Sequence, residues 1–423
     1  MIFDHPRFRR ALVAGSATVL LAGCGSTGVS TEPADPVTGD AAAAGRSTAS
    51  AASSTNRPVL TSAAGGAGEV TIEITDAGGC AISPSTVPAG GVTFAIFNVD
   101  ATAVNEVHLT AGDRIRGERE NLAPGFRATF SATLDGGSYQ IVCPGAKTES
   151  QPFTVTGEST QASGDVSDLL DRATSDYADY VSAQAGFLVE AAAALQKAVL
   201  AGNLVAAQQA YAKARPFFER IEPVADSFGD LDPDIDAREG DVPAADWKGF
   251  HPIERALFAD RNVAAARPYL ADLVADVGTL EKLTDELAVG TRAKNGKGYQ
   301  PDEVANGAAS LLEEVQKTKI TGEEERYSHI DLVDFAANVE GSQQAFAALV
   351  PALDRIDPAV AAPISAQFKA LIALLDAEQD AQALGGYTLY TDLSKAQIKK
   401  LSDALLAVQE PLSQVSAKVA AAG

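Results

Sequence analysis

The sequence predicts a multidomain protein in which an all-β sandwich precedes an all-α helical bundle. Short runs that alternate apolar and polar residues, punctuated by Gly and Pro, fill residues 69–157. Residues 165–420 are rich in Ala, Leu, Glu, Lys and Gln, and their apolar residues recur at helical spacing. The chain of 423 residues is also longer than one ordinary hydrophobic core requires. We therefore expect a separate core in each part.

The first 23 residues have the pattern of a lipoprotein signal peptide. Arg7, Arg9 and Arg10 form a basic segment, and a short apolar run over 11–21 follows it. The tetrapeptide LAGC then has the form of a bacterial lipobox, which makes Cys24 the lipidated first residue of the mature protein. The alternative is an ordinary secretory signal with a chance Cys. We expect an exported protein, tethered by lipid to the outer face of the cell membrane in the periplasm or at the cell surface.

Residues 24–68 consist mainly of Ser, Thr, Ala, Gly and Pro, with almost no large apolar side chain. Such a segment cannot bury enough surface to fold, so we expect a disordered stalk. The whole chain carries a formal charge of −23, from 56 acidic and 33 basic residues. This balance disfavours nucleic acid and anionic membrane surfaces as partners and attracts cations.

The predicted β domain contains four clear period-two runs, at 70–74, 92–99, 126–130 and 137–142. Roughly seven short strands in a segment of this length indicate a small sandwich. Its two cysteines, Cys80 and Cys143, lie in an exported protein, where thiols either pair as a disulfide or bind metal.

The helical domain is predicted to contain one long loop, over 223–245, with three Pro and many Asp. Long loops that are not disordered tend to be functional. The expected helices are 165–201, 204–221, 247–259, 263–289, 301–316, 330–350, 360–382 and 395–420.

The segment WKGFHPIERALF at 247–258 reads as the start of a helix, with Asp246 as N-cap and Pro252 in the first turn. His251 and Glu254 are three residues apart and share a helix face. An imidazole and a carboxylate side by side make half of a metal site or an acid–base pair. The alternative is a histidine that bonds a neighbour and a glutamate that complements the helix dipole.

Further acids flank the predicted loop. Glu219 and Glu222 are three residues apart, so they share a face, and Asp236 follows inside the loop. Each acid alone is typical of a solvated surface. Their concentration around one histidine favours a cation site.

At these residues the chain resembles a known family. The segments FERIEPVADSFGDLDPDIDAR, WKGFHPIE and GEEERYSHIDLVDFAANVEGSQ, together with residues 384–415, resemble the imelysin-like domain of the EfeO family. The β domain resembles the cupredoxin-like domain of that family. The resemblance implies a metal-binding component of an Efe-type iron-uptake system that captures iron and delivers it to a membrane permease. The iron permease and a haem peroxidase of the same system are the expected partners.

The resemblance also implies two sets of site residues. In the helical domain the family's HxxE motif falls on His251 and Glu254, and its acidic site falls on Glu219, Glu222 and Asp236. A further carboxylate is expected from a later helix, and the candidates are Glu313, Glu314 and Glu325, with His329 as a weaker one; we take Glu314 and Glu325. Oxygen-rich ligation suits a hard or borderline cation. The resemblance favours iron, as Fe³⁺ or Fe²⁺.

In the cupredoxin-like domain the resemblance implies a second metal site, at Cys80, Glu106 and Cys143, for copper or iron. This segment has one His and no Met, whereas a blue-copper centre needs two His and a Cys. A plain Cys80–Cys143 disulfide is the alternative.

Two other functions compete with iron transport. Imelysin-like domains have been classed as metal-dependent peptidases, but the predicted helix offers one His and no adjacent Glu, so we do not expect an enzyme. A protein that binds anionic polysaccharide through bridging cations is a further alternative.

Overall fold

The computed structural model describes residues 68–112, 114–120, 122–157 and 164–422. All of them belong to one compact unit, residues 62–423. The predicted signal peptide, the lipidation site Cys24 and nearly all of the stalk lie outside the described residues. Within the described ranges, no helix combines the length and apolar character that crossing a membrane requires.

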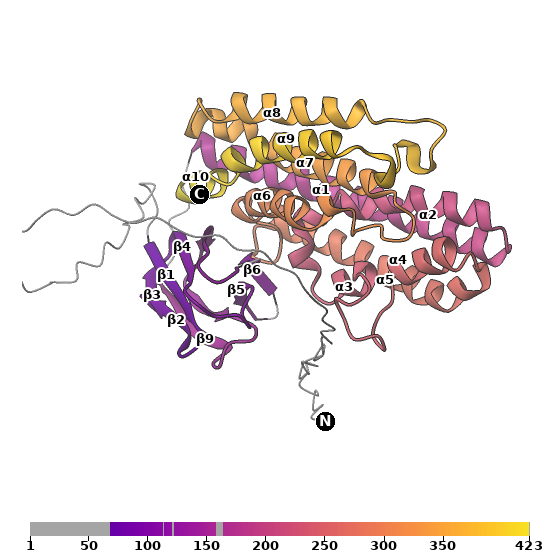
Figure 1. The fold of residues 1–423 in the computed structure, drawn as a ribbon. Coiled ribbons are helices and arrows are strands. Elements are labelled where there is room, and N and C mark those ends of the chain that lie inside the picture. The colour runs from indigo at the N-terminus through magenta and orange to yellow at the C-terminus, as the bar shows by residue number, and fades with distance from the viewer. Residues whose placement is uncertain (1–67, 113, 121, 158–163, 423) are drawn as a thin grey trace, which may run out of the picture. The chain divides into compact units, whose positions relative to one another are not determined.

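The N-terminal part is a sandwich of two β-sheets (Figure 1). One sheet has the strand order β2-β1-β4-β7 and the other β3-β9-β8-β5-β6. Most neighbours are antiparallel, but β1 pairs in parallel with β4, and β3 with β9. The strands are β1 Gly68–Thr75, β2 Gly79–Ser83, β3 Thr86–Pro88, β4 Gly90–Asn98, β5 Val107–Ala111, β6 Arg114–Arg119, β7 Arg127–Leu134, β8 Gly137–Val142 and β9 Ser150–Thr156.

The period-two pattern of the strands gives the sandwich its core. In β1 the alternate residues Val70, Ile72 and Ile74 are fully buried. Across the core, the ring of Phe94 stacks on Phe130 and meets the ring of Phe153 edge-on. These three aromatic residues come from β4, β7 and β9, so their contacts join the two sheets.

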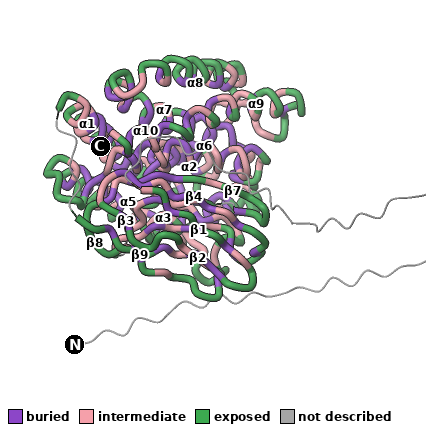
Figure 2. The backbone as a smooth tube through the Cα atoms, turned by 90° about the vertical axis from the view of Figure 1, so that its left-hand side faces the viewer, coloured by how far each residue is buried: buried purple, intermediate pink, exposed green. Residues whose placement is uncertain are grey.

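The C-terminal part is helical throughout. Figure 2 shows α7 as a buried helix, whereas α8 exposes much of its surface. The elements are α1 Asp165–Leu200, α2 Leu204–Glu219, η1 Glu222–Phe228, α3 Leu231–Asp236, α4 Phe250–Glu254, η2 Arg255–Ala259, α5 Val263–Ala293, α6 Pro301–Lys317, η3 Lys319–Thr321, α7 Asp331–Ile356, α8 Ala361–Asp376, η4 Leu384–Gly386, η5 Tyr390–Asp392, α9 Lys395–Leu412 and α10 Val415–Ala422.

The predicted helix at residue 247 starts later than expected. It begins at Phe250, and Gly249, not Asp246, is its N-cap. The φ angle of Gly249 is 88°, and a Cβ atom added there would lie 2.1 Å from the carbonyl oxygen of Ile235. The chain therefore needs a glycine at this close approach, and the approach sets where the helix starts.

Two other helical predictions are corrected. The expected loop at 223–245 contains the 3₁₀ helix η1 and the short helix α3. The expected last helix, 395–420, is divided into α9 and α10. Pro411 lies in the last turn of α9, and α10 begins four residues later.

Candidate metal centre

Helix α2 brings a basic and an acidic side chain together inside the helical domain. Arg215 and Glu219 are four residues apart, so they lie on one face of the helix, and both are fully buried. The Arg215 guanidinium pairs with Glu219 and also with Asp236 at the end of α3. Asp334 Oδ2 in α7 and Glu325 Oε1 each lie 3.0 Å from it. One buried cation thus gathers carboxylates from distant parts of the chain.

His251 lies in the first turn of α4 and is 2% exposed. The π-helical turn η2 follows α4 directly, and such turns occur frequently at functional sites. The Nδ1 atom of His251 lies 3.3 Å from Glu254 Oε2. The Nε2 atom has no hydrogen-bond partner among the described residues. A buried nitrogen without a partner is unusual enough to indicate a missing ligand.

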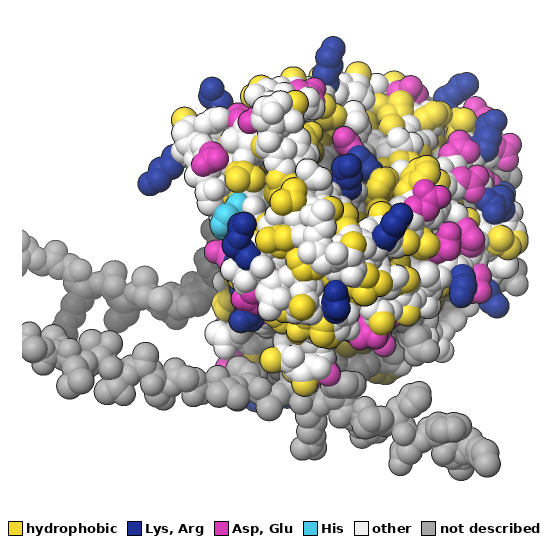
Figure 3. All heavy atoms as spheres, turned by 90° about the vertical axis from the view of Figure 1, so that its right-hand side faces the viewer, with side chains coloured by type: hydrophobic (Ala, Val, Ile, Leu, Met, Phe, Trp, Pro, Cys, Tyr) yellow, Lys and Arg dark blue, Asp and Glu magenta, His cyan; other side chains and the backbone are white. Residues whose placement is uncertain are grey.

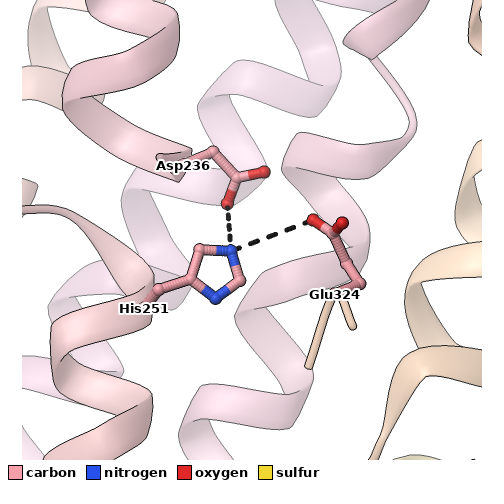
Figure 4. A group of neighbouring side chains, drawn as sticks. All are labelled: Asp236, His251 and Glu324. Atoms are coloured by element: carbon pink, nitrogen blue, oxygen red, sulfur yellow. Dashed lines mark ion pairs between the residues drawn. The ribbon is translucent and has the colours of Figure 1, made fainter. Parts of the chain in front are cut away.

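Figure 4 shows what Nε2 faces: Asp236 and Glu324. The distances are 3.5 Å to Asp236 Oδ1 and 3.8 Å to Glu324 Oε1. The three residues come from α3, α4 and the turn before α7, and their nearest ligand atoms lie within 4.8 Å of one another. An imidazole nitrogen and two carboxylates that converge in this way can bind a metal ion.

Two further groups of possible ligands share residues with this one. They are Glu219, Glu222 and Asp236, and Glu219, Glu324 and Asp334. The three groups together form one cluster of five carboxylates and one histidine, which we call the acidic cluster: Glu219, Glu222, Asp236, Glu324, Asp334 and His251. Asp236 belongs both to the group of Glu219 and Glu222 and to the group of His251, so this residue links the two groups.

Two buried cations offset part of the charge of the acidic cluster. Arg215 is one, and Lys319, 3% exposed, is the other. Lys319 Nζ lies 3.0 Å from Glu219 Oε2 and 2.8 Å from Glu222 Oε2. A third cation, Arg238, is 24% exposed at its side chain and lies 3.1 Å from Glu324 Oε2. The five carboxylates of the cluster therefore outnumber the three cations that pair with them. On the face drawn in Figure 3, acidic and basic side chains both occur.

The electrostatics inside the cluster follow from burial and from these pairs. Burial opposes ionisation of Glu219, but Arg215 and Lys319 hold its pKa down at about 2. Burial and the charge of Glu219 raise the pKa of Glu222 well above its ordinary value. Burial lowers the pKa of His251, but the hydrogen bond to Glu254 and the charge of Asp236 outweigh it and raise the pKa to about 9.

Glu254 lies beside the cluster and belongs to none of the three ligand groups. Its Oε1 atom accepts hydrogen bonds from the backbone N–H groups of Tyr327 and Ser328, both at 2.7 Å. Its Oε2 atom faces His251 Nδ1. The prediction that Glu254 is a metal ligand stays a prediction; in this structure its oxygens interact with backbone donors and with the imidazole. A carboxylate in this position orients the histidine.

The predicted late carboxylates are not among the ligand groups either. Glu325 Oε1 accepts a hydrogen bond from Tyr211 at 2.8 Å and pairs with Arg215. Glu314 interacts electrostatically with Lys319 without joining a group. Glu313 pairs with Arg119 and Lys317, and the weaker candidate His329 also belongs to none of the groups.

Sequence reasoning missed two carboxylates, Glu324 and Asp334. It also missed two cations, Arg215 and Lys319. A signal existed for Asp334, because Asp334, Asn338 and Ser342 repeat at i, i+4 and i+8 on the buried face of α7. Glu324 lies in a run of three glutamates within a turn. Glu324 and Glu325 are buried and Glu323 is exposed, and helical spacing could not show which of them belongs to the cluster.

In the β domain the two cysteines form a disulfide, Cys80–Cys143, with a Cα–Cα distance of 6.3 Å. The predicted adjacency of the two cysteines is confirmed. The predicted metal site of Cys80, Glu106 and Cys143 is corrected, because sulfur atoms bonded to each other are not thiolate ligands. Glu106 Oε2 lies instead 3.6 Å from Nε2 of His108.

Comparisons with known proteins agree with this division of the chain. Residues 173–415 match the Peptidase M75 family, imelysin. The chain is 38% identical over 353 residues to the iron uptake system component EfeO of Escherichia coli strain K12, which covers 82% of this chain and 90% of that protein. EfeO of Shigella flexneri gives the same values. The crystal structure of a putative iron-regulated protein A precursor from Parabacteroides distasonis ATCC 8503 is 16% identical, with a TM-score of 0.49, over 63% of this chain and 98% of that one.

Proposed function

The chain belongs to the EfeO family of iron-uptake components, with an imelysin domain, and on this basis we propose that it captures iron in the acidic cluster and delivers it to a membrane permease. The observation that carries the proposal is the buried Nε2 atom of His251, which lacks a hydrogen-bond partner and faces Asp236 and Glu324. Iron is the cargo of this protein, held for transfer.

The chemistry of the cluster fits a hard or borderline cation. Its members are five carboxylates and one imidazole, and carboxylate oxygens are the ligands that such cations prefer. The cluster has more carboxylates than cations paired with them, and this excess is offset by a di- or trivalent ion better than by a monovalent one. Among di- and trivalent ions, iron is favoured by the family, not by the ligand types alone.

The proposal extends to location and partners. We infer from the signal pattern that the protein is exported and anchored through Cys24, so that the iron-binding domain works outside the membrane. The N-terminal sandwich is proposed to be cupredoxin-like, which its mixed parallel and antiparallel sheets support. The permease and a haem peroxidase of the same uptake system are the proposed partners.

A peptidase mechanism has less support from the same residues. A zinc peptidase of the HExxH type binds metal through histidines at i and i+4, with a glutamate beside the first. Here Pro252 follows His251, and Arg255 occupies the i+4 position. The acidic cluster offers a single imidazole. We therefore favour metal transport over the peptidase activity that the family name suggests.

The test is a metal titration of the purified mature protein. Trp247 is the only tryptophan of the chain, and its indole N–H donates to the carbonyl of Ala237, next to Asp236. Its fluorescence should therefore report binding of Fe²⁺, Fe³⁺, Cu²⁺ or Zn²⁺ at the cluster. We expect iron to bind in the wild type and to bind at least about tenfold more weakly in His251→Ala, because a ligand is lost. Equal affinity in both proteins, or metal-dependent peptide hydrolysis that His251→Ala abolishes, would overturn the proposal.

A further inference from the structure

Lys319 supplies a cation inside the acidic cluster. Its Nζ atom lies 3.0 Å from Glu219 Oε2, 2.8 Å from Glu222 Oε2 and 3.7 Å from Glu324 Oε1. The residue is 3% exposed. The ammonium group thus has carboxylate oxygens on several sides, which is the surrounding that a hard metal ion also requires.

A metal ion bound anywhere in the cluster would compete with this ammonium group. Glu219, Asp236 and Glu324 each belong to two of the three ligand groups. Lys319 contacts Glu219 and Glu324, so each group contains at least one carboxylate that Lys319 already pairs with. Two cations that share carboxylates in a buried site repel each other strongly, because little water screens them. The metal ion and Lys319 cannot both keep these partners at full strength.

Three cations pair with the cluster, and Arg238 already lies partly in solvent at its edge, with a side chain 24% exposed. Of the two buried cations, Lys319 is the one that lies where it can leave. Arg215 is fully buried within the long helix α2, whereas Lys319 begins the three-residue turn η3 between α6 and α7. Its partner Glu222 has an 11% exposed side chain, while the side chain of Glu219 is fully buried. A lysine ammonium on a flexible four-carbon stem can therefore turn toward solvent beside Glu222.

We propose that Lys319 is an exchangeable internal cation, which neutralises the acidic cluster in the metal-free protein and moves to solvent when the cargo ion binds. The inference rests on the proposed function, because it assumes that the cluster binds a metal ion. It also assigns Lys319 a role in specificity. A cation must bind the carboxylates more strongly than the ammonium group does in order to displace it, so Na⁺ and K⁺ are kept out.

The first test follows Lys319 directly in the unaltered protein. The full chain, with and without saturating Mn²⁺, is treated with a limiting amount of an amine-acetylating reagent, and acetylation is measured by peptide mass spectrometry. Mn²⁺ is the probe because it favours oxygen ligands. Lys317 is the internal control, because it is two residues away, 30% exposed at its side chain, and paired with Glu313 outside the cluster. We expect acetylation of Lys319 to rise several-fold with Mn²⁺ and that of Lys317 to stay constant.

The second test removes the competing cation. Lys319→Met should bind Mn²⁺ about tenfold or more tightly than the wild type, because the metal no longer has to displace the ammonium group. Lys317→Met is the matched control and should bind as the wild type does. Lys319→Gln serves the same purpose if the Met variant does not fold.

The outcomes separate this inference from the proposed function. If Mn²⁺ binds the wild type while Lys319 stays protected from acetylation, the inference is wrong and the proposed function stands. If Lys319→Met and Lys319→Gln bind no more tightly than the wild type, the inference is again wrong. If Mn²⁺ binds neither the wild type nor the Lys319 variants, the inference is wrong, and the iron titration alone decides the proposed function.

Discussion

Replacing Glu254 by Gln tests whether this carboxylate acts on the metal through His251. In the wild type, Glu254 Oε1 accepts the backbone N–H groups of Tyr327 and Ser328, and Oε2 faces His251 Nδ1 at 3.3 Å. With Nδ1–H donating to this carboxylate, loss of the Nε2 proton leaves the lone pair of that nitrogen for a metal ion. The amide of a glutamine keeps one oxygen for the two backbone donors and turns its NH₂ group toward Nδ1. Nδ1 must then accept, and the imidazole proton moves to Nε2.

The expected loss follows from this change of tautomer. An imidazole protonated at Nε2 cannot bind a metal ion through that atom, so the metal must first move the proton against the hydrogen bond from Gln. Loss of such a supporting partner weakens metal binding by about 10–100-fold. That range corresponds to about 1.4–2.8 kcal/mol. The fold should be little affected, because both backbone hydrogen bonds are kept.

Glu254→Ala is the contrasting variant. It leaves the buried N–H groups of Tyr327 and Ser328 without their acceptor. Two hydrogen bonds to a charged group contribute about 3–6 kcal/mol together, so the free energy of unfolding should fall by that amount. The Gln variant should lose less, about 1–2 kcal/mol, since its hydrogen bonds lose the help of the carboxylate charge but both backbone N–H groups keep an acceptor.

Three measurements check the reasoning. Urea denaturation gives the stabilities, Trp247 fluorescence gives the metal affinities, and ¹⁵N NMR of the imidazole reports the tautomer of His251. Wild-type affinity in Glu254→Gln would refute the tautomer argument. A loss as complete as that of His251→Ala would show that Glu254 is itself a ligand.

Two further predictions concern other parts of the chain. Replacing both Cys80 and Cys143 by Ser removes a cross-link between residues 63 apart in sequence, so the free energy of unfolding, measured in urea, should fall by about 4 kcal/mol. Iron binding at the acidic cluster should stay unchanged. Impaired iron binding in the folded variant would show that the disulfide does more than stabilise the β domain. Burial and the charge of Glu303 raise the pKa of Asp302 to about 6. The folded protein therefore holds this proton more tightly than the unfolded chain, so the contribution of Asp302 to stability declines by about 3 kcal/mol as the pH rises from about 4 to 6. Asp302→Asn should remove this part of the pH dependence, and unfolding curves of the same pH dependence in both proteins would show the assignment to be wrong.

The secondary structure of most of the chain could be predicted from the sequence, because apolar periodicity is a local property. The alternating run at 70–74 lies within β1, and the predicted helices 165–201 and 263–289 correspond to α1 and α5. The start of α4 could not be predicted in this way. Gly249 is required there because the carbonyl of Ile235 packs against its Cα, and this contact exists only after α3 and α4 have met.

The same distinction applies to the site. The pairs Glu219/Glu222 and His251/Glu254 were visible in the sequence because residues three apart share a face of a helix. The family resemblance added Asp236. The tertiary structure alone decided that Glu254 orients the histidine, since its partners Tyr327 and Ser328 lie more than 70 residues away.

Tertiary packing also decided which residues complete the cluster. Both Glu324 and Glu325 are buried and lie near Arg215, but only Glu324 also faces Nε2 of His251, and the turn has no periodicity to distinguish them. Lys319 reads as an ordinary surface lysine in the sequence, yet it lies 3% exposed among three carboxylates. Local patterns specify which elements form, but charge compensation in a buried cluster depends on elements that are distant in sequence and meet only in the folded protein.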